Sequence, residues 1–195
     1  ALLSRGLGDV YKRQPYYNKP TQEGLFQHYK KIGDTVAIPQ ILYNVPGRTS
    51  VDMLPETVQR LSTHTNIIGI KEASGNKDRS MQLMKLCSEN IQIFTGDDKT
   101  SMSDIIDGFS GNISVTANVA PLEMHMMCKY AIEGNLEKAT EINSKIETLH
   151  DILFCESNPI PVKWCLNKMG LIKKGIRLPL TCLLYTSDAA DEASS

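Results

Sequence analysis

Four short apolar runs, separated by segments of helical pattern, constrain the fold of this chain more than any other feature. Short, continuous apolar runs are typical of strands that are buried on both faces of a parallel sheet. The four predicted strands are residues 38–43 (IPQILY), 67–71 (IIGIK), 91–95 (IQIFT) and 112–116 (NISVT). Repeated strand–helix units of this kind predict an α/β chain with right-handed crossover connections.

Helical patterns precede and follow these runs and then occupy the C-terminal part of the chain. The first helix follows Thr21, a residue type that favours the N-cap position. After Ala120 the strand pattern stops, and Pro121 opens the next helix, as proline often does at a first helical position. The predicted helices are residues 22–33, 54–61, 78–87, 101–109, 121–133, 136–153 and 159–169.

Two architectures fit this order of elements. One is a small doubly wound domain, and the other is half of an eightfold (β/α) barrel, which typically needs about 250 residues. Periodicity alone does not choose between them. Unusual residues at or just after the C-terminal ends of predicted strands favour the barrel, because barrel enzymes keep their chemistry there. These residues are Tyr43, Arg48, Lys71 and Gly96.

The composition excludes several function classes. A net charge of -1 over 195 residues gives no electrostatic footprint for nucleic acid or an anionic membrane, and no apolar run approaches the ~20 residues that span a bilayer. The five cysteines are scattered without a CxxC pair, and the four histidines lack metal-ligand spacing. We therefore expect a cytoplasmic protein with reduced thiols, no metal site, and histidines on the surface or on helix faces.

The two ends of the chain share one short DNA sequence. Residues 9–14 (DVYKRQ) can be encoded by GAT GTG TAT AAG AGA CAG, and the reverse complement, read one base later, encodes residues 182–187 (CLLYTS). The ends thus resemble a translated sequencing adapter in opposite orientations, with chance as the alternative. We expect residues 1–14 and 182–195 to be non-native, and residues 15–181 to be a fragment of a longer protein.

Lys71 ends the apolar run 67–70 and is the first candidate for chemistry. A lysine in apolar surroundings has a lowered pKa, so a neutral, nucleophilic amine can condense with a carbonyl to form a Schiff base. The alternative is a strand-end lysine whose ammonium reaches solvent along its apolar stem. The sequence around Lys71 leaves both open.

Tyr43 and Arg48 follow the preceding strand in LYNVPGRT. A phenol at a strand end can carry protons to and from a substrate, or it can pack as an ordinary strand tyrosine. A turn at residues 44–47 is predicted to direct Arg48 over the strand ends, where a guanidinium can bind a carboxylate. A solvated loop arginine is the alternative.

Two further loops carry candidates. Tyr16 and Tyr17 precede the first helix and suit a subunit contact, a site or the core. Gly96 follows the third strand and can let the backbone approach a ligand, while Asp98 can place a negative charge at a helix start.

Six motifs, in this order and spacing, resemble the dihydrodipicolinate synthase family and cover residues 15–181. They are PYYNKPTQEGL, LYNVPGRT, NIIGIKEASGN, FTGDD, GNISVTANVAP and NPIPVKW. The resemblance implies a (β/α)8 TIM barrel of the pyruvate-dependent class I aldolase type with extra C-terminal helices. Residues 15–120 would be the C-terminal half of the barrel with its last four strands. Residues 121–181 would be its last helix and a truncated C-terminal helical region.

The resemblance also implies an activity and a set of roles. Pyruvate and L-aspartate-4-semialdehyde would condense to 4-hydroxy-tetrahydrodipicolinate, in lysine biosynthesis through diaminopimelate, without a cofactor. Lys71 would form the Schiff base, and Tyr43 would shuttle protons in a relay with a threonine and Tyr17 of a neighbouring subunit. The other implied positions are Arg48 for the semialdehyde carboxylate, Gly96 and Ile113 for the pocket backbone, and Tyr16 for the interface of a homotetramer.

The relay threonine lies outside residues 15–181, so we expect the 195 residues alone to be inactive. Two other functions remain open. Another pyruvate-lysine lyase, such as N-acetylneuraminate lyase or a keto-sugar-acid aldolase, would share Lys71 and Tyr43 but would not need Arg48. A non-catalytic binding protein on the same barrel would be expected to lack the lysine or the tyrosine.

Overall fold

The computed structural model describes residues 10–13 and 15–184. The chain divides into two compact units. The first unit comprises Ala1–Ile113 and Ala131–Gly134, and the second comprises Ser114–Tyr130 and Asn135–Ser195. The candidate residues for chemistry all belong to the first unit.

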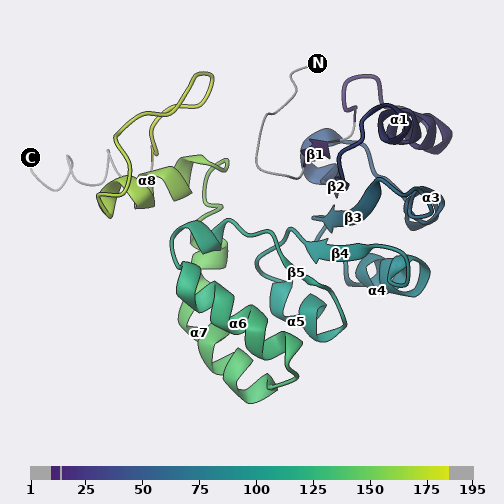
Figure 1. The fold of residues 1–195 in the computed structure, drawn as a ribbon. Coiled ribbons are helices and arrows are strands. Elements are labelled where there is room, and N and C mark those ends of the chain that lie inside the picture. The colour runs from purple at the N-terminus through teal and green to yellow at the C-terminus, as the bar shows by residue number, and fades with distance from the viewer. Residues whose placement is uncertain (1–9, 14, 185–195) are drawn as a thin grey trace, which may run out of the picture. The chain divides into compact units, whose positions relative to one another are not determined.

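A parallel sheet forms the centre of the first unit. Its strands follow one another in sequence order, and each neighbouring pair is parallel, so every connection crosses over the sheet (Figure 1). The strands are β1 (Val10–Arg13), β2 (Gln40–Asn44), β3 (Ile67–Glu72), β4 (Gln92–Thr95) and β5 (Gly111–Asn112).

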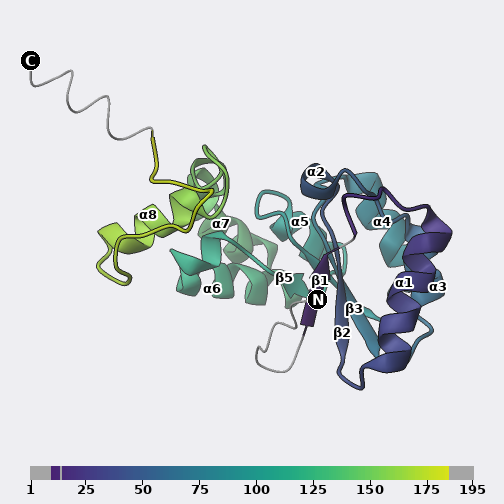
Figure 2. The ribbon, with the colours of Figure 1, turned by 90° about the horizontal axis from the view of Figure 1, so that it is seen from above.

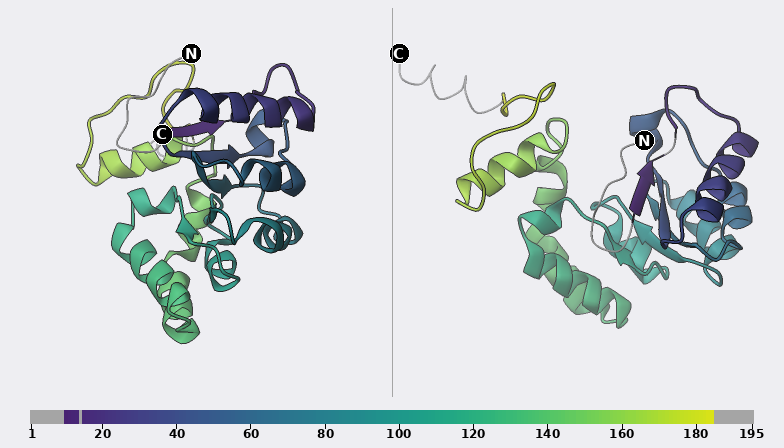
Figure 3. Two further views of the ribbon diagram at one scale, coloured as in Figure 1. Left: turned by 45° about the vertical axis from the view of Figure 1, so that its right-hand side comes forward. Right: turned by 45° about the horizontal axis from the view of Figure 1, so that its top comes forward.

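Helices cover one face of this sheet. Figures 1 and 2 both show α1, α3 and α4 on the same side of the strands, and the right-hand view of Figure 3 agrees. A doubly wound domain instead reverses its strand order and carries helices on both faces. The observed order therefore favours the barrel. The helices of this unit are α1 (Gln22–Thr35), α2 (Pro46–Thr49), α3 (Pro55–Leu61), α4 (Lys77–Cys87) and α5 (Ser101–Ile106).

Local sequence explains where the main helices begin. The Thr21 hydroxyl accepts a hydrogen bond from Gly24 N at 3.2 Å, which confirms the predicted N-cap of α1. Asn76 caps α4 in the same way, accepting from Arg79 N at 3.1 Å. Under α1, Leu25 and Tyr29 are almost fully buried, so the apolar stripe of the helix forms part of the core.

Two elements of the first unit were not predicted. β1 pairs with β2 although its residues lie in the segment expected to be non-native. Sheet hydrogen bonds join backbone groups, so an extended segment can pair with an edge without the apolar pattern that identifies a buried strand. The origin of residues 1–14 stays a prediction. The predicted turn at 44–47 is in part the short helix α2, because Pro46 suits a first helical position.

Helices dominate the described part of the second unit, as predicted: α6 (Pro121–Ile132), α7 (Leu136–Ile152) and α8 (Ile160–Lys168), after a 3₁₀ turn at Thr116–Asn118 (Figure 3). His150 lies on a face of α7, which the prediction for the histidines allowed, but this face is buried and the side chain is 4% exposed. Its Nδ1 lies 2.9 Å from the Thr116 hydroxyl, a partner 34 residues away that no local pattern indicates.

Candidate functional site

Tyr43 and Lys71 stand side by side at the C-terminal ends of β2 and β3. They are register partners, and the Lys71 amine (Nζ) lies 4.5 Å from the centroid of the Tyr43 ring. Alternate strand residues point to opposite faces of a sheet. Both side chains therefore lie on one face, and their neighbours Asn44 and Glu72 lie on the other. The structure thus brings together the two residues predicted to carry the chemistry.

Because Gly96 has no side chain, the Lys71 side chain can occupy the space beside it. A Cβ atom at this position would lie 2.5 Å from Lys71 Cε and 2.8 Å from Ala73 Cβ, closer than carbon atoms approach. The Gly96 N–H also donates to the Glu72 carbonyl at 2.6 Å, which ties the end of β4 to the end of β3. Glycine at this position is therefore explained by the lysine beside it.

Burial and charge act in opposite directions on Lys71. Its half-buried position lowers the pKa of the amine below that of an ordinary lysine, and the Asp98 carboxylate opposes this effect. Asp98 is 3% exposed and accepts a hydrogen bond from Asn112 Nδ2 at 2.8 Å. The sequence suggested a helix-start charge at Asp98. The structure instead makes it a buried carboxylate close enough to affect Lys71, which its position after a strand end could have indicated.

Arg48 lies on α2, beyond the same strand end as Tyr43. The backbone of α2 is held by buried Thr49, whose hydroxyl lies within hydrogen-bond distance of the carbonyls of Val45 and Val51, at 3.1 and 2.9 Å. The Arg48 side chain is exposed. An exposed guanidinium on a fixed backbone at this position is compatible with binding an anionic group beyond the strand end.

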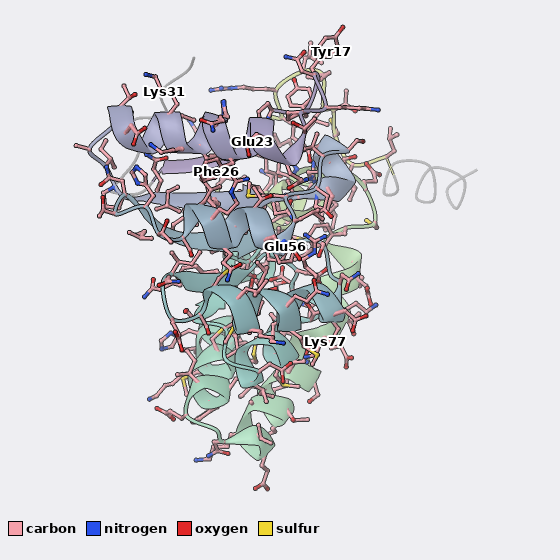
Figure 4. All side chains as sticks on the ribbon, turned by 90° about the vertical axis from the view of Figure 1, so that its right-hand side faces the viewer. Tyr17, Glu23, Phe26, Lys31, Glu56 and Lys77 are labelled. Atoms are coloured by element: carbon pink, nitrogen blue, oxygen red, sulfur yellow. The ribbon has the colours of Figure 1, made fainter. Side chains whose placement is uncertain are left out.

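The remaining predicted residues are Tyr16 and Tyr17, which precede α1, and Ile113, which follows β5. Tyr16 and Tyr17, before α1, are 63% and 89% exposed, and Figure 4 shows Tyr17 projecting away from the helices. The roles of Tyr16 and Tyr17 at a subunit interface stay predictions. Ile113 follows β5, and its N–H donates to the Thr95 carbonyl at 2.9 Å.

A buried polar network behind the pair was not predicted. The Asn44 amide donates to Glu72 Oε2 at 2.9 Å and to Asp52 Oδ1 at 3.0 Å. The Ser74 N–H donates to Glu72 Oε1 at 2.8 Å, and Arg79 forms an ion pair with Asp52. The sequence did contain one signal for this network. Glu72 directly follows the strand-end lysine, so its carboxylate must point to the opposite, helix-covered face and needs buried polar partners there.

Other features of the described residues do not add to this site. A cleft of about 580 Å³ opens near the other ends of β3 and β4, and Ser62, His64 and Asn90 are among its lining residues. Across residues 10–13 and 15–184, no group of three or more His, Cys, Asp or Glu side chains could hold a metal ion. In the same residues, no helix combines the length and apolar character needed to cross a membrane.

Known proteins resemble the chain over most of its length. The sequence model of the dihydrodipicolinate synthetase family matches residues 5–192. A curated 4-hydroxy-tetrahydrodipicolinate synthase from Pseudomonas putida (strain W619) is 61% identical over 169 residues, which are 87% of this chain and 58% of the relative. The corresponding protein of Alcanivorax borkumensis is 58% identical over 166 residues, or 85% of this chain and 56% of the relative. The chain thus spans less than two-thirds of these relatives.

Solved structures of the same family also resemble the fold of this chain closely. The chloride-inhibited dihydrodipicolinate synthase of Acinetobacter baumannii, complexed with pyruvate, is 50% identical with a TM-score of 0.90, covering 96% of this chain and 64% of that one. The enzyme of Thermotoga maritima is 42% identical with a TM-score of 0.89 and the same coverage. The predicted fold class, an α/β chain forming part of a (β/α)8 barrel, is confirmed. By sequence and by fold, this chain belongs to the dihydrodipicolinate synthetase family.

Proposed function

We propose that the protein is a Schiff-base-forming lyase that condenses pyruvate with L-aspartate-4-semialdehyde to 4-hydroxy-tetrahydrodipicolinate. The observation that carries this proposal is the half-buried Lys71 amine, 4.5 Å from the Tyr43 ring centroid. The relatives' names and the pyruvate complex of the Acinetobacter baumannii structure support the same reaction. This step belongs to lysine biosynthesis through diaminopimelate, in the cytoplasm.

Lys71 supplies the electron sink of the proposed reaction. Its lowered pKa makes the neutral amine accessible, and this amine attacks the keto carbon of pyruvate and releases water. The resulting iminium draws electrons from the adjacent methyl group, which loses a proton to give an enamine. The enamine carbon then attacks the aldehyde of the second substrate, which regenerates the iminium. The amino group of that substrate attacks the iminium carbon, and the ring closes as the Lys71 amine leaves. The Tyr43 hydroxyl would carry protons in these steps.

Arg48, Gly96 and Ile113 would bind rather than react. Arg48 would pair with the carboxylate of the semialdehyde, and the other two would form the pocket with their backbone. Tyr17 would complete the proton relay of a neighbouring subunit, with Tyr16 at the same interface. Exposed aromatic side chains such as these suit a subunit contact, and a homotetramer is the form that the family resemblance implies.

A hybrid enzyme allows the activity to be tested. In it, the matched 169-residue segment of this chain replaces its counterpart in the Pseudomonas putida relative, which supplies the remainder of the barrel. Borohydride trapping with pyruvate, followed by peptide mapping, detects the adduct, and a coupled assay detects condensation. A hybrid that folds but shows neither adduct nor condensation would refute the proposed function.

Replacing Arg48 by alanine in the hybrid should impair the second half-reaction only. We expect kcat/KM for the semialdehyde to fall about tenfold, because the variant loses a charge-assisted hydrogen bond at an exposed site. The rate of pyruvate adduct formation should stay within about twofold of the parent. Arg60→Ala is the matched control, since Arg60 pairs with Glu23 on the helix-covered side. Equal loss in both half-reactions would contradict the role of Arg48.

The pH dependence of adduct formation should reflect both effects on Lys71. Only the neutral amine attacks, so the initial trapping rate should rise with pH and reach half its maximum below the ordinary lysine pKa. Asp98→Asn removes a charge that holds this pKa up, and Asn112 can still donate to the new amide oxygen. The midpoint should then move to lower pH. A midpoint that moves upward would show that Asp98 does not act on Lys71 by its charge.

A further inference from the structure

Asn44 and Glu72 directly follow the two candidate catalytic residues. Tyr43 is the register partner of Lys71, and Asn44 is the register partner of Glu72. One peptide unit on each strand therefore connects each member of the first pair to a member of the second. A shift of Asn44 relative to Glu72 would therefore also shift the backbone that carries Tyr43 relative to the backbone that carries Lys71.

The Asn44–Glu72 contact is buried, and further hydrogen bonds fix the orientation of both side chains. Asn44 is 0% exposed and Glu72 is 3% exposed. The orientation of the Asn44 amide is fixed because its oxygen accepts from Met53 N at 3.0 Å while its nitrogen donates to Glu72 and Asp52. Glu72 receives a donor at each oxygen, from Asn44 and from the Ser74 N–H.

Neighbouring elements hold this contact in place. Arg79 of α4 donates to the Met53 carbonyl at 2.8 Å and pairs with Asp52, so the segment that orients Asn44 is fastened to a helix. Burial raises the pKa of Glu72, while the bonds from Asn44 and Ser74 and the charge of Arg79 favour its ionised form. The bonding pattern needs acceptors at both Glu72 oxygens, because a proton on either would face a donor.

A buried network of this kind costs free energy through desolvation, and an apolar pair of the same size would often serve stability as well. Its position immediately behind the pair offers a reason for its presence. Resting on the proposed function, we propose that the Asn44–Glu72 contact is a positioning device that fixes β2 against β3 and so sets the placement of the Tyr43 ring over the Lys71 amine. Both side chains lie on the face of the sheet opposite to Lys71 and Tyr43.

Glu72→Gln in the hybrid enzyme tests the role of this contact. The amide keeps the shape of the side chain but has one acceptor oxygen, so either Asn44 or Ser74 loses its partner. We expect kcat to fall about tenfold to thirtyfold while KM for both substrates changes less than about threefold, because misplacement affects the reacting groups more than binding. Thermal unfolding should remain cooperative, and the adduct should still map to Lys71. Glu56→Gln, an exposed change on α3 (Figure 4), is the matched control and should leave kcat unchanged.

A reversed pair separates positioning from stability. In Asn44→Asp/Glu72→Gln, the glutamine nitrogen donates to the aspartate while its oxygen still accepts from Ser74, and the other aspartate oxygen still accepts from Met53. We expect kcat to recover at least about threefold over Glu72→Gln, even where the melting temperature does not recover, since the new carboxylate faces Asp52. If Glu72→Gln does not fold, Glu72→Asp replaces it, because this side chain keeps both acceptors but is one methylene too short for the present contact with Asn44.

The possible failures are distinguishable. A parent hybrid that shows neither adduct nor condensation refutes the proposed function before any variant is made. An active parent whose folded Glu72→Gln or Glu72→Asp variant keeps kcat within twofold refutes the positioning role alone. A loss of kcat that follows the melting temperature across the single and reversed variants also refutes it, since that result describes a purely structural contact.

Discussion

Replacing Lys71 by arginine in the hybrid enzyme is expected to abolish the trapped pyruvate adduct and to lower synthase activity by at least about 10³-fold. Arginine keeps the positive charge near Asp98 and the cation beside the Tyr43 ring, so the electrostatics of the site are largely preserved. A guanidinium stays protonated at any working pH and has no free amine to condense with a ketone. The loss should therefore report the missing nucleophile.

Lys31→Arg provides the control for this experiment. Lys31 is an exposed lysine of α1, on the helix-covered side of the sheet (Figure 4), and its replacement should change neither trapping nor turnover. Peptide mapping of the parent should place the adduct on the peptide that contains Lys71. An adduct on another lysine, or one that persists in Lys71→Arg, would show that the nucleophile has been assigned to the wrong residue.

The sequence predicted the order of elements well because the signals involved are local. The buried runs at 38–43 and 67–71 become β2 and β3 within two residues at each end. The N-cap at Thr21 also lies within one turn of the residues that it serves. The predicted strand at 112–116 was too long, since β5 ends at Asn112 and Thr116 begins a 3₁₀ turn. Valine, isoleucine and threonine favour strands, but the chain turns here despite that preference.

The site was predictable in part for a similar reason. Lys71 and Tyr43 are found from their own strands, and parallel pairing brings strand ends to one edge of the sheet. Their contact depends on the register of β2 against β3, which cannot be read from the sequence. The Asn44–Glu72 contact depends on residues 28 positions apart and on Met53 and Arg79 from two further segments. No periodicity connects such positions, so only the folded chain shows this network.

Gly96→Ala is expected to slow adduct formation in the hybrid enzyme by about 10²-fold, although it adds a single methyl group. The new carbon would meet Lys71 Cε at 2.5 Å and Ala73 Cβ at 2.8 Å. Ala73 Cβ is fixed to the backbone, so the new methyl group cannot be relieved on that side. The lysine side chain must therefore rotate away, and its amine leaves the position beside Tyr43. A displacement of about 1 Å at reacting groups costs a factor of this size.

Overpacking of this kind also costs about 1–3 kcal/mol of stability, which a protein with about 5–15 kcal/mol in reserve can lose and remain folded. Thermal melting therefore separates the loss of stability from the loss of activity. We expect a cooperative transition at a lower temperature, and adduct formation reduced about 10²-fold in the protein that remains folded. Gly24→Ala is the matched control, because its Cβ would meet Pro20 Cβ and the Thr21 hydroxyl at ordinary distances of 3.4 and 3.5 Å. Adduct formation in folded Gly96→Ala at the Gly24→Ala rate would mean that Lys71 does not act from the position it holds in this structure.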